Sequence, residues 1–265
     1  MFDRFDRPIS YLRISVTDKC NLRCRYCMPP EGVMPRRHED LLSFEQMAAV
    51  ARAAVRLGVT KIRLTGGEPL VKRDIPDLVR MLTGIEGLEH LAMTTNGTLL
   101  PKFVVPLREA GLDSVNISLD TLEPEKYRFL TRGGNLKDAL AGIRAARQEG
   151  FPVKINMVVL QDTRPQEIEA MRRFCEECGL RLQLINHYDL GRKKTDSYGF
   201  DRPPSCSCCD RIRLMADGML KPCLHSDLEV KLDFSRLEDS LKEAALLKPE
   251  HGDICRNRAM SQIGG

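Results

Sequence analysis

The sequence predicts an α/β fold, a partial barrel of six βα units followed by a small extension that carries cysteines. Three observations support this prediction. Strand-like and helix-like segments alternate over residues 1–190, polar residues and glycines gather where the strands end, and the composition changes after Leu190. Regular βα alternation requires right-handed crossovers and therefore a parallel sheet.

The individual elements follow from hydrophobic periodicity along the chain. Strand-like runs cover residues 11–16, 61–65, 88–94, 114–119, 153–160 and 182–186. Apolar residues recur at helical spacing over 44–55, 73–82, 101–110, 136–149 and 166–178. The first of these helices has the clearest limits, because Ser43 is a good N-cap and Gly58 ends the periodic run.

The polar residues at the strand ends favour a partial barrel over an open doubly wound sheet. They comprise a cysteine loop after the first strand, Gly66-Gly67-Glu68-Pro69 after the second, Thr94-Thr95-Asn96-Gly97 after the third and Ser118-Leu119-Asp120 after the fourth. Barrel active sites are built at this carboxyl-terminal face, whereas an open sheet concentrates its ligand contacts at one switch point. We expect a barrel over residues 1–190.

The extension is expected to cover residues 191–265. Gly191-Arg192-Lys193-Lys194 and Pro203-Pro204 are typical of a linker. Asp217-Gly218 indicates the turn of a hairpin, and the apolar spacing over 237–247 predicts one helix.

The composition excludes several function classes. The 265 residues include 41 Lys and Arg against 37 Asp and Glu, a net charge of +4 without a long basic run. Neither nucleic-acid binding nor membrane-surface binding is therefore indicated. No run of about 18 apolar residues and no signal-peptide core is present, so we expect a cytoplasmic protein. In a reducing compartment the ten cysteines are not expected to form disulfides, and clustered thiols indicate metal or cluster ligation.

The first group of cysteines, Cys20, Cys24 and Cys27, has C-x3-C-x2-C spacing on the loop after the first strand. Three thiolates at this spacing can ligate three irons of an iron–sulfur cube and leave the fourth iron open. A structural zinc site normally has four ligands, and disulfides need an even number of cysteines, so the odd number argues against both.

The second group, Cys206, Cys209 and Cys223, has C-x2-C-x13-C spacing around the expected hairpin. Three thiolates again allow a cluster with an open iron. A zinc ribbon that uses Cys208 or a remote thiol as its fourth ligand is an equally good interpretation of the spacing. Cys175 and Cys178, one turn apart on an expected helix, are assigned no role.

The first cysteine motif with Tyr26, followed by Gly66-Gly67-Glu68-Pro69, resembles the radical S-adenosylmethionine (radical SAM) superfamily. The resemblance implies a TIM-like partial barrel whose [4Fe–4S] cluster reductively cleaves S-adenosylmethionine. A glycine-rich strand end lets the backbone approach the methionine part of that cofactor. The matching cofactor contacts would be Tyr26, Gly66, Gly67, Glu68, Pro69 and Ser118, with Arg63 and Thr94 beside them on the side of the substrate.

Both cysteine groups, with Arg211-Ile212-Arg213-Leu214, Ala216-Asp217-Gly218 and Gly264-Gly265, resemble more narrowly the GTP 3′,8-cyclase family of molybdenum-cofactor biosynthesis. The resemblance implies a lyase with two [4Fe–4S] clusters, GTP as substrate and an external electron donor; it leaves the oligomeric state open. The residues that it places at the substrate are Arg13, Lys154, Arg211, Arg213, Gly264 and Gly265. Several fixed guanidinium groups suit a triphosphate.

Two features depart from that family. Only about twenty residues separate the sixth strand from the second cysteine group, where the family has a longer stretch, and His187-Tyr188 replaces an acidic residue followed by an aromatic residue and methionine. A radical SAM enzyme with another substrate, a peptide or a small metabolite, therefore stays open, with His187 as an acid or base. So does a non-enzymatic scaffold that binds zinc or a cluster, and ligation of the second group by Cys208 or Cys255.

Overall fold

The computed structural model describes residues 1–34, 36–187, 189–195, 199–200 and 205–264. One mixed sheet of nine strands runs through it in the order β6-β5-β4-β3-β2-β1-β7-β8-β9. Its strands are β1 (Tyr11–Ser15), β2 (Lys61–Thr65), β3 (His90–Thr95), β4 (Ser114–Ser118), β5 (Val153–Val159), β6 (Arg181–Asn186), β7 (Arg211–Leu214), β8 (Met219–Lys221) and β9 (Val230–Lys231).

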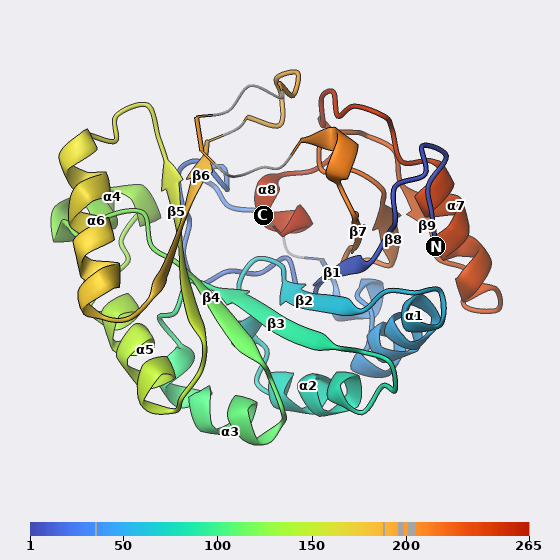
Figure 1. Cartoon of the computed structure of the whole chain (residues 1–265), viewed down its shortest axis with the longest axis horizontal. Helices are drawn as coiled ribbons and strands as arrows, with labels where there is room; N and C mark the ends of the chain where they lie inside the picture. Colours follow the sequence, from blue (N-terminus) through green and yellow to red (C-terminus); the bar gives the residue numbers. More distant parts are fainter. Residues whose placement is uncertain (35, 188, 196–198, 201–204, 265) are drawn as a thin grey trace.

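The helices are α1 (Phe44–Arg56), α2 (Ile75–Thr83), α3 (Val104–Glu109), α4 (Pro124–Thr131), α5 (Leu136–Gln148), α6 (Pro165–Glu177), α7 (Leu237–Leu246) and α8 (Met260–Ile263). Figure 1 shows α1 to α6 along the outside of the curved sheet, with α8 near the centre of the curve. Among the described residues, no helix has the length and apolar character that crossing a membrane requires.

Strand order confirms the partial barrel. β1 to β6 are parallel and follow one another in sequence order across the sheet, without the reversal that creates the switch point of a doubly wound fold. Because the order does not reverse, right-handed crossovers place the helices on one side of the sheet. The concave side is thereby left for inward-pointing side chains.

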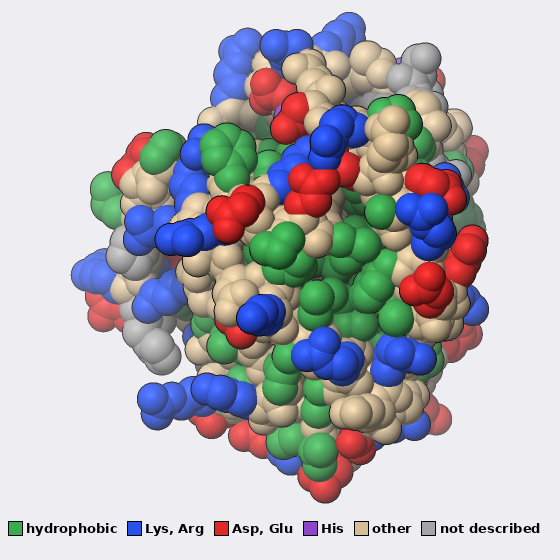
Figure 2. Space-filling view, turned by 90° about the vertical axis from the view of Figure 1, so that its left-hand side faces the viewer, with side chains coloured by type: hydrophobic (Ala, Val, Ile, Leu, Met, Phe, Trp, Pro, Cys, Tyr) green, Lys and Arg blue, Asp and Glu red, His purple; other side chains and the backbone are tan. Residues whose placement is uncertain are grey.

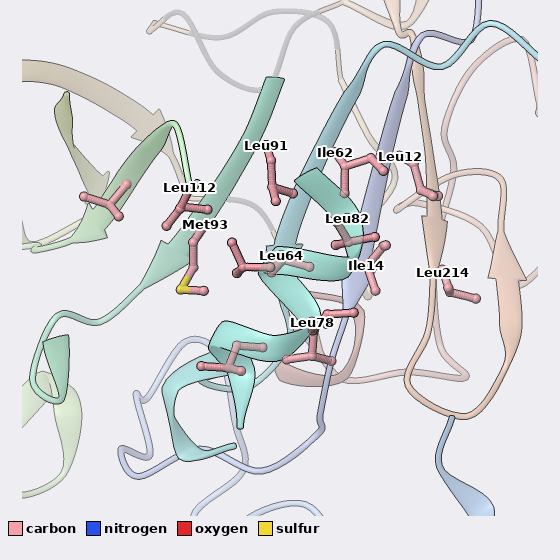
Figure 3. Packing of buried hydrophobic residues seen from close by; sticks show 14 of the residues in the cluster. Leu12, Ile14, Ile62, Leu64, Leu78, Leu82, Leu91, Met93, Leu112 and Leu214 are labelled. Atoms are coloured by element: carbon pink, nitrogen blue, oxygen red, sulfur yellow. The ribbon is translucent and has the colours of Figure 1, made fainter. Parts of the chain in front are cut away.

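The core lies between the sheet and these outer helices. Leu12 and Ile14 of β1, with Ile62 and Leu64 of β2, belong to the buried cluster that also includes Leu78 of α2 (Figure 3). All five side chains are at most 1% exposed. Since side chains alternate along a strand, the residues between them point to the concave side. In β1 these are Tyr11, Arg13 and Ser15.

The extension continues the sheet of the barrel. β7 pairs in parallel with β1, and β8 and β9 follow it as antiparallel neighbours. The predicted turn at Asp217-Gly218 is present, with Gly218 at a φ of 80°. The hairpin is thus confirmed, whereas its place beside β1 was not predicted.

The structure differs from the predicted helices in three places. The segment predicted as one helix over 101–110 is a 3-10 turn (Leu100–Lys102) followed by α3, and it contains Pro101 and Pro106. Proline lacks the donor that continues a helix, so it is best tolerated in a first turn. α4 and α8 were not predicted, because each is too short to show a helical period.

Charged side chains of both signs are mixed on the side of the molecule that bears α4 and α6. Figure 2 shows Lys and Arg lying among Asp and Glu there, around a central area of hydrophobic side chains. This mixture agrees with the small net charge of +4. Among its described residues, this face therefore has no large patch of charges of one sign.

Candidate functional site

The first cysteine group lies directly after β1, on a loop that turns back on itself. The amides of Cys27 and Met28 both donate to the carbonyl oxygen of Cys24, at 3.0 Å each. The Sγ of Cys20 accepts from the amide of Leu22 at 3.4 Å and lies 3.9 Å from Asn96 Nδ2. Asn96 follows β3, so the end of a second strand also holds this loop.

All three thiols are half-buried and free. Burial raises the pKa of Cys20 to about 11, with Glu68 adding to the effect, and raises the pKa of Cys27 to about 12. Burial, Asp120 and the other two thiols raise the pKa of Cys24. Three neighbouring thiolates in this setting need a positive partner, which ligated iron supplies. The donor set therefore fits a cluster.

The two glycines after β2 are required by the approach of residues 17–19, which lead into Cys20. A Cβ on Gly67 would lie 2.3 Å from the carbonyl oxygen of Lys19, and one on Gly66 would lie 2.4 Å from that of Thr17. The Gly67 amide donates to the Thr17 carbonyl oxygen at 2.8 Å. Gly66 also has a φ of +134°, which side chains rarely allow. The glycine motif thus positions the cysteine loop.

Glu68 ties together the ends of β2 and β3. Its carboxylate accepts from the amide of Leu70 at 3.1 Å, the hydroxyl of Thr95 at 2.7 Å and the amide of Asn96 at 2.7 Å. The side chain is 1% exposed, and burial raises its pKa to about 7 despite these donors. Pro69 begins a 3-10 turn (Pro69–Val71).

Tyr26 is fixed by the end of β4. Its hydroxyl donates to Asp120 Oδ2 at 2.6 Å, and Asp120 Oδ1 accepts from the amide of Val158 at 2.9 Å. Burial raises the pKa of Asp120 to about 6. The rings of Tyr26 and His187 form a T-shaped pair, with 6.2 Å between their centroids and 76° between their planes.

A pocket of about 460 Å³ opens beside the cysteine loop. Its lining includes Tyr26, Cys27, His187 and Met260. Exposed His187 therefore lies at the opening where the loop, the end of β6 and the segment before α8 meet.

Three arginines lie in register across the concave face of the sheet. Arg13 of β1 is the Cα partner of Arg63 in β2 and of Arg213 in β7. Two residues earlier on the same two strands, Arg211 of β7 is the Cα partner of Tyr11 of β1. The Tyr11 hydroxyl accepts from Arg63 Nε, and Arg63 Nη1 donates to the Thr94 hydroxyl at 3.3 Å. Strand pairing therefore brings together four arginines that the sequence analysis assigned to the site.

The charges of these arginines act on one another. Arg13 is 9% exposed and Arg213 is 5% exposed. Burial lowers the pKa of Arg13 to about 10, and the charges of Arg213, Arg63 and Arg211 contribute to this shift. Burial raises the pKa of Tyr11, but the cations Arg13, Arg63 and Arg211 lower it overall. Gathered like charges of this kind are stabilised by a bound anion.

The last described residues reach this row. Arg13 Nη2 donates to the Gly264 carbonyl oxygen at 3.2 Å, and the Ser15 hydroxyl donates to that of Gln262 at 3.1 Å. A Cβ on Gly264, whose φ is 73°, would lie 2.6 Å from Thr65 Cγ2. Gly265, also predicted at the site, lies outside the described residues, as does Tyr188.

Arg258 anchors this last segment. Its guanidinium donates to Asp217 Oδ2 at 2.7 Å and to both carboxylate oxygens of Glu229, at 2.8 and 2.7 Å. The Ser261 amide donates to the carbonyl oxygen of Cys27 at 3.3 Å. The segment therefore joins the hairpin to the first cysteine loop.

The second cysteine group lies at the beginning of β7 and the end of β8. Cys206 is buried, Cys209 and Cys223 are half-buried, and none of the three forms a disulfide. The Gly252 amide donates to Cys206 Sγ at 3.3 Å, and a Cβ on Gly252 would lie 3.5 Å from Cys223 Sγ. Cys206 and Cys223 thus flank Gly252, and the Cys209 amide donates to the Cys206 carbonyl oxygen at 3.2 Å.

Cations surround this second group. Burial raises the pKa of Cys209, but Lys248, Arg211 and Arg213 lower it overall. Burial raises the pKa of Cys223, and Lys248 opposes the rise. Lys194 Nζ lies 3.0 Å from Cys206 Sγ. A donor set of three thiols with positive neighbours also fits an iron–sulfur cluster, which carries net negative charge when ligated by thiolates.

The two cysteine groups occupy opposite ends of the neighbouring strands β1 and β7. The first group follows β1, whereas Cys206 and Cys209 precede β7, which runs parallel to β1. Four residue steps from Tyr11 to Ser15 correspond to roughly 13 Å at about 3.3 Å per residue. The arginine row lies between the two ends.

The remaining predicted residues occupy several places. Lys154 is half-buried on β5, where its Nζ donates to Gln183 Oε1 at 3.2 Å; Ser118 is half-buried at the end of β4. Exposed Cys208 donates to the Ser205 carbonyl oxygen at 3.5 Å. Cys255 is 3% exposed in an apolar cluster, and its thiol donates to Asn257 Oδ1 at 3.3 Å.

Sequence reasoning missed four residues that shape the site: Asp120 as the partner of Tyr26, Gly252, Lys194 and Arg258. Asp120 follows a strand end and could have been found from that position. The other three lie in stretches without periodicity, where local sequence gives no signal of a distant partner.

A known protein family, named proteins and solved structures are similar to this chain. The model of the radical SAM superfamily matches residues 14–175. A protein named GTP 3′,8-cyclase from Alkaliphilus oremlandii is 38% identical over 322 residues, and one of the same name from Moorella thermoacetica is 40% identical over 323. Each alignment covers 100% of both chains. The first spans 322 positions against 265 residues here, so about 57 positions face gaps in this chain.

Among solved structures, Streptococcus suis SuiB bound to S-adenosylmethionine matches with a TM-score of 0.70 at 18% identity. The match covers 93% of this chain and 65% of the SuiB chain, so this chain spans slightly less than two thirds of that protein. At this identity, the likeness concerns the fold.

Proposed function

The chain belongs to the radical SAM superfamily and, within it, to the GTP 3′,8-cyclase family, and on that premise we propose that it cyclises GTP. The reaction would join ribose C3′ to guanine C8. The observation that carries the proposal is the row of Arg213, Arg13 and Arg63, in register on three strands between the two cysteine groups. When bound, a [4Fe–4S] cluster with S-adenosylmethionine supplies a 5′-deoxyadenosyl radical that abstracts a hydrogen atom.

The arginines are assigned to the triphosphate. Each charge-assisted hydrogen bond contributes about 1.5–3 kcal/mol, and planar guanidinium groups bind phosphate oxygens in pairs. A polyanion would also relieve the mutual repulsion that lowers the pKa of Arg13. Arg211 and Lys154, on the same concave face, are assigned to the nucleotide as well, and Gly264 and Gly265 to the end of the site nearest Arg13.

We assign the first cluster to Cys20, Cys24 and Cys27 and S-adenosylmethionine to the adjoining strand ends. Tyr26, Ser118, Thr94 and the Gly66-Gly67-Glu68-Pro69 turn would position that cofactor. In this assignment Asp120 fixes the ring of Tyr26, and Glu68 acts through the geometry of two strand ends because its oxygens already accept three hydrogen bonds.

We assign a second [4Fe–4S] cluster to Cys206, Cys209 and Cys223, where it would face the guanine base. The cationic neighbours of these thiols support an anionic cluster over a neutral site. The exposure of Cys208 supports three protein ligands and an open iron. The barrel (1–190) and the extension (191–265) would then each contribute one cluster. Reducing equivalents would come from an external low-potential donor, and ten cysteines that form no disulfide are consistent with a cytoplasmic location.

A second candidate is the same radical chemistry on another anionic small molecule. It is favoured by the roughly 57 alignment positions that this chain lacks and by exposed His187 at the pocket. His187 would then act as an acid or base toward that substrate.

The proposal is tested with protein reconstituted anaerobically with iron and sulfide. GTP, S-adenosylmethionine and dithionite are added, and the products are separated by chromatography and identified by mass spectrometry. We expect 5′-deoxyadenosine together with an isomer of GTP that carries the C3′–C8 bond, and about eight irons per chain. Deoxyadenosine without a cyclised nucleotide would refute the GTP assignment and support the second candidate. The Cys27→Ala variant, which lacks a ligand of the first cluster, should form neither product.

A further inference from the structure

The second cysteine group has a cationic hydrogen-bond donor of its own. Lys194 Nζ lies 3.0 Å from Cys206 Sγ, within the range of an N–H···S hydrogen bond, and the Gly252 amide donates to the same sulfur at 3.3 Å. Cys206 is 7% exposed, so this sulfur is shielded from water. An ammonium donor interacts more strongly with a shielded sulfur than with a hydrated one.

The position of Lys194 is fixed by its neighbours. Its amide donates to the Asp253 carbonyl oxygen at 3.1 Å, and its Cδ lies 3.1 Å from where a Cβ on Gly252 would be. The absence of a side chain at residue 252 therefore lets the lysine stem pass toward Cys206. The contact is built from two separate stretches of chain, 194 and 252–253.

A second lysine nearby is occupied differently. Lys248 is 1% exposed, and its Nζ donates to the carbonyl oxygens of Arg211 at 2.7 Å and Pro222 at 3.0 Å. It bridges the two strands of the hairpin, whereas Lys194 donates to a sulfur. Lys248 therefore acts on Cys209 and Cys223 through its charge alone, whereas Lys194 donates a hydrogen bond directly to a ligand sulfur.

The first cysteine group has the opposite surroundings. The Sγ of Cys20 accepts from the neutral amide of Leu22, and Glu68 and Asp120 are the carboxylates that act on its thiols. Hydrogen bonds and positive charge at ligand sulfurs favour the reduced form of a cluster, which carries one more negative charge. The two cysteine groups are therefore built to favour different reduction potentials.

We propose that Lys194 raises the reduction potential of the second cluster through its hydrogen bond to Cys206. This inference rests on the proposed function, in which Cys206, Cys209 and Cys223 hold that cluster. Lys194 stabilises the added negative charge when one electron arrives from an external low-potential donor. No bond forms or breaks in this step, and no proton needs to move.

The test is a potentiometric titration of the reconstituted full chain, followed by electron paramagnetic resonance. The signal that changes on addition of S-adenosylmethionine belongs to the first cluster, and the other belongs to the second. Lys194→Met should shift the reduction equilibrium of the second cluster about tenfold toward the oxidised form, which is ~59 mV for one electron. The first cluster should titrate as in the wild type.

Two variants serve as controls. Lys193→Met removes the same charge at an exposed neighbouring position and should leave both potentials unchanged. Lys194→Arg keeps the charge and the donor and should stay near the wild-type potential. Equal potentials for Lys194→Met and Lys193→Met would overturn the inference. So would loss of the second cluster from both Lys194 variants, because the lysine would then serve assembly.

Iron content distinguishes failure of the proposed function from failure of the inference about Lys194. Only about four irons per wild-type chain, with no second signal, would remove the second cluster itself. Two signals whose potentials do not respond to Lys194 would leave the second cluster in place and overturn only the role of this lysine.

Discussion

The substitution Gly67→Ala tests how the glycine motif positions the first cysteine loop. The added Cβ would lie 2.3 Å from the Lys19 carbonyl oxygen and 2.9 Å from that of Asp18, whereas ordinary contacts begin near 3.4 Å. Both atoms belong to the backbone, so no side-chain rotation relieves the overlap, and residues 18–19 must move by about 1 Å. Overpacking of this kind costs about 1–3 kcal/mol. The displaced backbone leads directly into Cys20.

We therefore expect the variant to lose about 1–3 kcal/mol of unfolding free energy, measured by urea denaturation of the cluster-free protein. On reconstitution its iron content should fall from about eight to about four per chain, with the second cluster retained. Gly84→Ala is the matched control, because Gly84 has a φ of −76° and its nearest neighbour atom to an added Cβ is 3.5 Å away. A Gly67→Ala variant with wild-type stability and iron content would refute this reasoning.

Three further predictions concern charged residues. Arg13→Met removes a charge-assisted contact and should weaken GTP binding by about 10- to 100-fold in a calorimetric titration. The control Arg52→Met, at an exposed position, should leave the affinity unchanged. Equal affinities of the two variants for GTP would contradict the role of Arg13. Because burial raises the pKa of Glu68 to about 7, the folded state binds its proton more tightly than the unfolded state. The unfolding free energy of the cluster-free protein should therefore fall by about 3 kcal/mol as pH rises from about 4.5 to 7, and Glu68→Gln should flatten that slope. Arg258→Met leaves two largely buried carboxylates without this partner, so it should lower the unfolding free energy by about 3 kcal/mol and increase hydrogen exchange at residues 259–264. The control Arg236→Met, at an exposed ion pair, should lower the unfolding free energy by less than about 1 kcal/mol.

The barrel could be predicted because its signals are local. Each of the first six strands has an apolar run of its own and ends in a polar or glycine-rich turn, and these runs match the observed strands to within about two residues, as such boundaries allow. α4 escaped because Pro124–Thr131 is a polar segment of eight residues, too short to show a helical period. Its start was nevertheless marked by Pro124 at the first helical position.

The candidate site could be predicted only as a set of residue types. Cys20, Cys24 and Cys27 are close in sequence, so their spacing alone placed them together. The row of Arg13, Arg63 and Arg213 depends on the pairing of β1 with both β2 and β7, and no local pattern encodes the partner of a strand. The second cysteine group could be found from its spacing. Its position at the opposite end of strands β1 and β7 from the first group depends on the same pairing.

The central claim is that the two cysteine groups and the arginines between them act on GTP. The most direct test follows the hydrogen that the radical removes. With GTP deuterated at C3′, S-adenosylmethionine and dithionite, the isolated 5′-deoxyadenosine should contain one deuterium, and the nucleotide product should lack it. Deoxyadenosine that forms without deuterium, while GTP is recovered with its label, would contradict the claim.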